Sequence, residues 1–138
     1  MLLTGTLVAV PLTLLQCASV VHHTGALPTE AQVAQFALLD VLLAHAVYDA
    51  DRARDVSDGD ARVAYFATTG VAAAAASVVL WQGGAPSFVP PLLGLHATYA
   101  ESKPVLAPIK PFFVGATWVA ATTYLPLTLL GVYALDGD

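Results

Sequence analysis

Apolar residues in this chain gather into long runs that are separated by short polar stretches. The runs cover approximately residues 2–21, 31–48, 63–81, 88–99 and 112–133. All but the fourth reach the roughly 17–25 residues with which an α-helix crosses about 30 Å of hydrocarbon. The pattern predicts an all-α, polytopic transmembrane helix bundle with four to five membrane segments, in which residues 1–138 form a single domain.

The fourth run is shorter than the others. Counted from Pro86 to Ala100 it spans only about 22 Å as a helix, and Pro90 and Pro91 stand near its start. Both a full crossing and a tilted or re-entrant segment fit this length.

Local signals mark several boundaries. Thr29 is followed three residues later by Gln32, which predicts a helix start with a capping box. The stretch "WQGGAP" predicts a tight turn after a helix. The run of small residues from Gly70 to Ser77 predicts a helix face that packs closely against another helix. Pro126 lies inside the last run and is expected to bend it.

Composition supports a lipid environment. Hydrophobic residues make up 57% of the chain and charged residues 11%, against about 25% charged residues in ordinary soluble domains. The net charge of −5 excludes a nucleic-acid partner, which requires a basic face. The expected partners are the lipid bilayer and other membrane protein subunits. A thylakoid, a mitochondrial inner membrane and a prokaryotic plasma membrane are all compatible with the sequence.

A few polar residues fall within or near the predicted membrane segments. Asp40 lies about 15 Å beyond Glu30, near the bilayer midplane, where a carboxyl group must be protonated, paired or turned into a polar cavity. We therefore expect Asp40 to face the interior of the bundle. His45 and His96 are expected either to form a hydrogen bond with a neighbouring helix or to ligate a buried metal, such as chlorophyll magnesium or haem iron.

Charge is concentrated between residues 47 and 62, which hold five of the ten acidic residues. Asp51 and Asp55 are four residues apart and share a face if they lie on a helix. With Asp58 they could hold Mg²⁺ and a diphosphate. The alternative is a solvated turn in which Arg52 and Arg54 neutralise nearby acids.

Two stretches resemble the first half of the UbiA-type intramembrane prenyltransferases. They are "AVYDADRARDVSDGDAR", which follows an apolar helix, and "YAESKPVLAPIKPFFVGATWVAATTYLP". The order of Tyr99, Lys110, Trp118 and Pro126 is similar to that of the family. The resemblance implies Mg²⁺-diphosphate ligands at Asp51, Asp55 and Asp58, and diphosphate contacts from Lys103 or Lys110.

The chain departs from that family in its second half. Beyond residue 60 its acidic residues are Glu101, Asp136 and Asp138, so a second acidic motif is missing from this sequence. We therefore expect a non-catalytic accessory or scaffold subunit of a larger photosynthetic or respiratory membrane complex, such as a photosystem, built on half of a UbiA-like scaffold. Chlorophyll or carotenoid would then be possible cofactors. The alternative is a Mg²⁺-dependent prenyltransferase that joins a prenyl diphosphate to an aromatic acceptor.

Overall fold

The computed structural model describes residues 2–94, 104–105, 107–109, 112, 116–117 and 119–131. The side chains of residues 2–6, 47–48, 50–51 and 54 fall outside this description. All of the regular structure in the described residues is helical. The all-α prediction is therefore confirmed for this part of the chain.

The first three predicted helices are present. They are α1 (Leu2–Thr24), α2 (Glu30–Asp55) and α3 (Gly59–Gln82). Helix α2 begins at the predicted capping box, in which the Gln32 backbone N–H donates to Thr29 Oγ1 (3.2 Å) and the Thr29 N–H donates to Gln32 Oε1 (2.8 Å). These bonds satisfy backbone donors that a helix start would otherwise leave unpaired.

Helix α2 extends beyond the apolar run from which it was predicted. The run ended near Tyr48, whereas the helix continues through the charged residues to Asp55. Alanine and arginine are good helix formers, so "ADRAR" supports further turns once a helix has started. Residues 47–62 are thus divided between the end of α2, a short turn and the start of α3.

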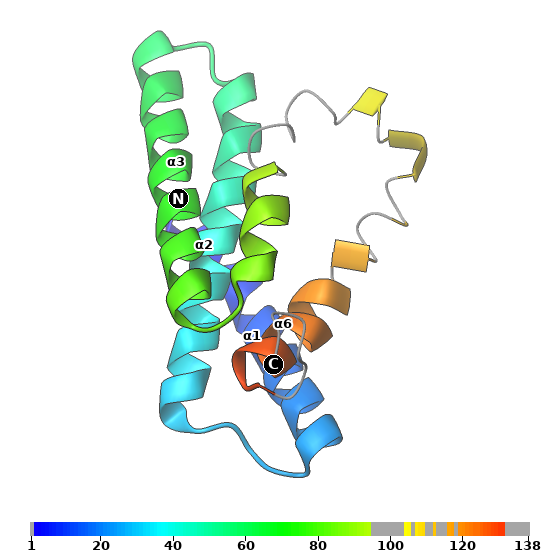
Figure 1. Ribbon diagram of the computed structural model, residues 1–138. Coiled ribbons are helices and arrows are strands. Elements are labelled where there is room, and N and C mark those ends of the chain that lie inside the picture. Colours follow the sequence, from blue (N-terminus) through cyan, green and yellow to red (C-terminus); the bar gives the residue numbers. More distant parts are fainter. Residues whose placement is uncertain are drawn as a thin grey trace.

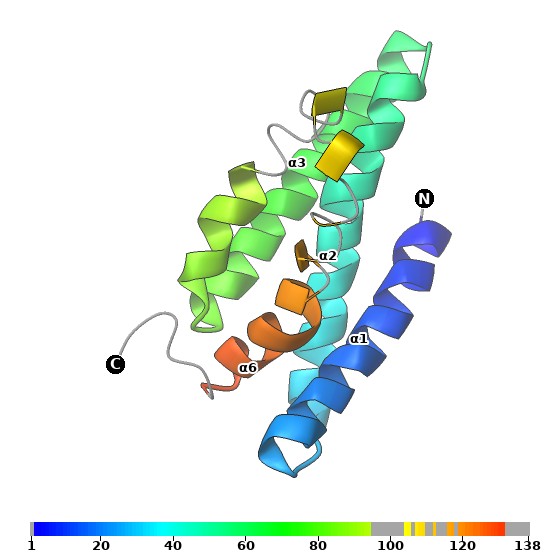
Figure 2. The same ribbon diagram turned by 90° about the vertical axis from the view of Figure 1, so that its right-hand side faces the viewer.

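Helices α2 and α3 run side by side along their length (Figures 1 and 2). Small residues make this contact, because Ala46 of α2 packs with Ala72 and Ala73 of α3. Closer to the Glu30 end, Leu39 packs with Ala76 and Leu80. The predicted close packing of the Gly70–Ser77 face against another helix is confirmed, and the partner is α2 of the same chain.

The turn after α3 also follows the prediction. Gly83 caps the helix and Gly84 has a positive φ of 85°. A Cβ atom at Gly83 would lie 2.6 Å from Gln35 Nε2 and 3.0 Å from Leu129 Cδ2. Glycine at this position therefore allows the turn to approach both α2 and the C-terminal helical segment.

Shorter helical pieces complete the described fold. A 3₁₀ turn, η1 (Pro86–Phe88), leads into helical residues 89–94, and a second 3₁₀ turn, η2, covers Ala107–Ile109. The last run contains a π-helical turn, η3 (Ala120–Tyr124), followed directly by α6 (Leu125–Leu129). Pro126 lies in the first turn of α6 and has no N–H to donate, and the turn directly before α6 is π-helical. The bend expected at Pro126 stays a prediction.

The Ala120–Leu129 stretch, orange to red in the figures, packs against α1 near the Glu30 end of α2 (Figures 1 and 2). Val20 of α1, Phe36 of α2 and Leu127 of α6 form one buried cluster. The first two helices and the distant α6 therefore meet here, and the polar site described below lies among them.

Two described helices are long and apolar enough to cross a membrane, through Leu7–Thr24 of α1 and Gly59–Gln82 of α3. In α2 the continuously described side chains end at residue 46, so its full apolar run is not covered by this statement. The fourth and fifth predicted segments fall partly outside the described residues. Four to five crossings therefore remain a prediction.

Candidate functional site

The most buried polar site in the described residues surrounds Asp40, whose exposed fraction is 0%. Thr13 Oγ1 of α1 donates a hydrogen bond to Asp40 Oδ2 (2.7 Å), and Gln16 Nε2 of α1 donates to Asp40 Oδ1 (2.9 Å). Both carboxyl oxygens therefore accept a bond from the neighbouring helix. The prediction that Asp40 faces the bundle interior is confirmed.

Gln16 links this site to a third segment. Its Nε2 also donates to the carbonyl oxygen of Ala121 (2.9 Å), which belongs to the π-turn η3. The side chain is only 1% exposed and lies between Leu12 and Val20 on the buried face of α1. A single carboxamide thus joins α1, α2 and η3.

The other end of the same carboxamide is not satisfied. Gln16 Oε1 is buried and has no hydrogen-bond partner. Rotating the amide would turn this oxygen toward Asp40 Oδ1 and the Ala121 carbonyl, both of which are acceptors, so the assigned orientation is the favourable one. An oxygen acceptor without a donor costs roughly 1–3 kcal/mol when buried.

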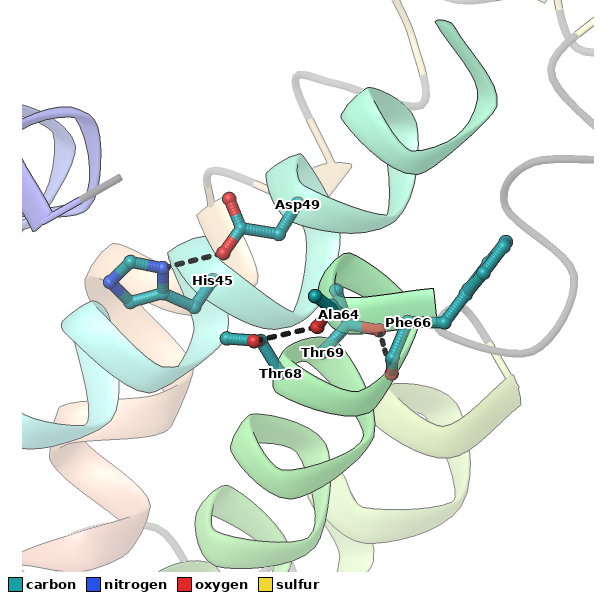
Figure 3. A network of polar contacts seen from close by, with 6 residues as sticks. All are labelled: His45, Asp49, Ala64, Phe66, Thr68 and Thr69. Carbon is teal, nitrogen blue, oxygen red and sulfur yellow. Dashed lines mark hydrogen bonds and ion pairs between the residues drawn. The ribbon is translucent and has the colours of Figure 1, made fainter. Parts of the chain in front are cut away.

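His45 and Asp49 form a second polar pair further along α2. His45 Nδ1 lies 2.8 Å from Asp49 Oδ2, and the two residues occupy successive turns of the helix (Figure 3). Asp49 is only 3% exposed. The expectation that His45 bonds to a neighbouring helix is wrong for this nitrogen, because an i, i+4 carboxylate on the same helix is within closer reach.

Thr68 and Thr69 of α3, also drawn in Figure 3, bond within their own helix. Thr68 Oγ1 donates to the Ala64 carbonyl oxygen (2.9 Å), and Thr69 Oγ1 donates to that of Phe66 (3.0 Å). His45 lies on the side of α2 that faces away from these threonines. The Asp49 carboxylate orients the imidazole, which is how carboxylates commonly orient histidine ligands of metals.

The predicted Mg²⁺-diphosphate residues lie around the α2–α3 turn. Asp55 is exposed at the end of α2, and Asp58 is the N-cap of α3, where its Oδ2 accepts a bond from the Ala61 N–H (3.3 Å). Arg62 Nη2 donates to the Val56 carbonyl oxygen (2.8 Å) and closes the turn. Asp51 lies in the last turns of α2, and its side chain is outside the described residues.

Within the described part of the chain, no three or more His, Cys, Asp or Glu side chains are grouped so that they could hold a metal. Lys103, Lys110 and His96 lie outside the described residues. The Mg²⁺ site at Asp51, Asp55 and Asp58, and the lysine contacts to diphosphate, therefore stay predictions.

The sequence pattern did not predict that Thr13 and Gln16 belong to the Asp40 site, although one feature of the sequence indicates it. Both are polar residues inside an apolar run, and their spacing of three places them on one helix face. Their pairing with Asp40 depends on how α1 crosses α2, which the local pattern does not specify.

Searches against protein-family models, curated proteins and solved structures found no match to this chain.

Proposed function

We propose that this chain is a small integral membrane protein that acts as a non-catalytic accessory or scaffold subunit of a larger membrane complex. The observation that supports this proposal is the low buried fraction of the two helices that are long and apolar enough to cross a membrane. Only 22% of the residues in Leu7–Thr24 are buried, and 28% of those in an 18-residue apolar window of Gly59–Gln82. The core helix of a soluble protein would be mostly buried, so the exposure of these two helices supports a surrounding of lipid or another protein.

Both helices, α1 and α3, carry large apolar side chains that are exposed. Leu14 of α1 is 65% exposed, and Val71 and Trp81 of α3 are 71% and 68% exposed. Helix α1 also contributes Thr13 and Gln16 to the network around Asp40. This integration supports a structural helix over a cleaved signal segment.

The buried polar groups support a scaffold over an enzyme. Thr13, Gln16 and Asp40 bond to one another and tie helical segments together. Asp58 is engaged as a helix cap. Such contacts fix the arrangement of helices in lipid, where hydrophobicity does not distinguish one helix partner from another.

A complex-stability experiment tests the proposal. The tagged chain is extracted from its native membrane in two mild detergents, and its mass and subunit stoichiometry are measured by native mass spectrometry. We expect a fixed stoichiometry with other membrane subunits in both detergents. Val71→Lys should abolish this assembly by placing a charge on the exposed face of α3. Leu27→Lys is the matched control, since Leu27 is 81% exposed in the α1–α2 connection and outside both helices.

A prenyl-transfer assay tests the alternative directly. The purified chain would be incubated with Mg²⁺, a prenyl diphosphate and aromatic acceptors, beside the Asp51→Asn, Asp55→Asn double variant. Turnover by the wild type that the double variant loses would overturn the subunit proposal and favour the UbiA-type enzyme. A monodisperse chain that binds no other subunit would also contradict the proposal.

A further inference from the structure

We propose that Asp40, Gln16 and Thr13 form a binding site for one monovalent alkali cation such as Na⁺, which holds α1, α2 and the π-turn η3 together. This site is separate from the predicted Mg²⁺ residues at the α2–α3 turn. It follows from two deficits that a single cation would remove.

The first deficit is one of charge. Asp40 is 0% exposed, and its hydrogen-bond partners Thr13 and Gln16 are both neutral. Among the described residues, no Lys, Arg or His forms an ion pair with it. An ionised carboxylate inside a helix bundle is costly unless a positive charge lies beside it.

The second deficit is one of hydrogen bonding. Gln16 Oε1 is buried without a donor, although the Nε2 atom of the same carboxamide makes two bonds. Native proteins pair the large majority of their buried polar atoms. The orphan oxygen belongs to the group that contacts Asp40 Oδ1, so both deficits occur in one place.

A proton on Asp40 would remove the charge deficit and leave Gln16 Oε1 unpaired. A cation removes both deficits, because it balances the carboxylate and accepts coordination from the carboxamide oxygen. Alkali and alkaline-earth cations prefer oxygen ligands of this kind. A single carboxylate matches a charge of +1, whereas protein sites for Ca²⁺ commonly use several carboxylates.

The neighbouring oxygen atoms suit such an ion. Thr13 supplies a hydroxyl oxygen and Ala121 a carbonyl oxygen from the π-turn. π-Turns within helices occur frequently at functional sites. Carbonyl oxygens from irregular helix turns are also a recurring means of coordinating ions inside membrane proteins.

The test uses the purified full-length chain in lipid nanodiscs, with Na⁺ as the probe. Thermal unfolding is compared in about 100 mM NaCl and in choline chloride of equal ionic strength, and binding stabilises the folded state by mass action. We expect Na⁺ to raise Tm by about 3 °C or more. Equilibrium binding of ²²Na⁺ should saturate at one ion per chain.

Variants locate the effect. Asp40→Asn should remove both the Tm shift and ²²Na⁺ binding, and Gln16→Met should weaken ²²Na⁺ binding by about tenfold or more. Asp60→Asn is the matched control and should bind ²²Na⁺ as the wild type does, because Asp60 is exposed in the first turn of α3. If Asp40→Asn does not fold, Thr13→Val serves in its place and should lower the affinity for ²²Na⁺.

A folded wild-type chain with equal Tm in both salts and no bound ²²Na⁺ would overturn the proposal. Binding that Asp40→Asn and Gln16→Met leave unchanged would also overturn it, because the ion would then lie elsewhere.

Discussion

Leu39 and Asp40 are neighbours in α2, yet they serve two different interfaces. Leu39 packs with Ala76 and Leu80 of α3, and Asp40 accepts hydrogen bonds from Thr13 and Gln16 of α1. The α2–α3 contact is thus made by small and aliphatic side chains, whereas the centre of the α1–α2 contact is polar. Close packing of small residues and hydrogen bonds between helices are two separate means of helix association, and this chain uses one on each side of α2.

The difference has a consequence for specificity. A face of alanines can slide along its neighbour with little change in contact. A carboxylate that requires a hydroxyl and a carboxamide fixes both rotation and depth. We infer that the polar interface determines the register of α1 and that the small-residue interface supplies most of the packing between α2 and α3.

Removing a large side chain from the packed interface should have the largest effect. Leu39→Ala deletes a fully buried side chain and should lower the free energy of unfolding by about 2–5 kcal/mol. Detergent-titrated unfolding, followed by circular dichroism, measures this loss. The control is Leu38→Ala at the adjacent position, which is 50% exposed and should change little. Equal losses in the two variants would contradict the assigned face of α2.

Adding volume to the same interface should be nearly as damaging. Ala76 has an exposed fraction of 0% at the α2–α3 contact, and Ala76→Leu should lower the free energy of unfolding by about 1–3 kcal/mol through overpacking. Ala74→Leu, on the exposed face of α3, is the control. An unchanged midpoint for Ala76→Leu would show that the helices are not in close contact there.

The polar interface should respond more weakly to loss of one hydroxyl. Thr13→Val keeps the shape of the side chain and removes its bond to Asp40 Oδ2. The expected loss is about 0.6–2 kcal/mol, the range for hydrogen bonds between helices in membranes. The same unfolding assay measures it, with Thr68→Val as control, since the Thr68 hydroxyl bonds only within α3. A larger loss of unfolding free energy in Thr68→Val than in Thr13→Val would contradict the role of Thr13 in joining α1 to α2.

The sequence pattern predicted the first three helices, the capping box at Thr29, the turn at Gly83 and Gly84, and the buried position of Asp40. These features depend on local chemistry or on the cost of burying a charge. The pattern did not predict that Asp49 pairs with His45 or that Gln16 reaches Ala121. The first contact depends on the choice of side-chain rotamers. The second depends on how two segments cross whose contacting residues, Gln16 and Ala121, are 105 positions apart in the sequence.

The charged stretch illustrates the same limit. Its acids lie at a helix end, where Asp55 is exposed and Asp58 caps α3, and the Mg²⁺ site there stays a prediction. Asp40, a single acid in an apolar run, lies at the centre of the buried network. An isolated charge among apolar residues was the stronger indicator of a buried site in this chain, because a cluster of charges can be solvated at a helix end.

A double-mutant cycle between Asp40 and Gln16 tests the central claim that a polar contact joins α1 to α2. The free energy of unfolding is measured for Asp40→Leu, Gln16→Leu and the double variant. Replacing both partners by apolar groups removes the unsatisfied atoms that each single change leaves behind. We predict that the loss in free energy of unfolding of the double variant is smaller, by about 1–3 kcal/mol, than the sum of the losses of the two single variants. Losses that add to within about 0.5 kcal/mol would contradict the claim.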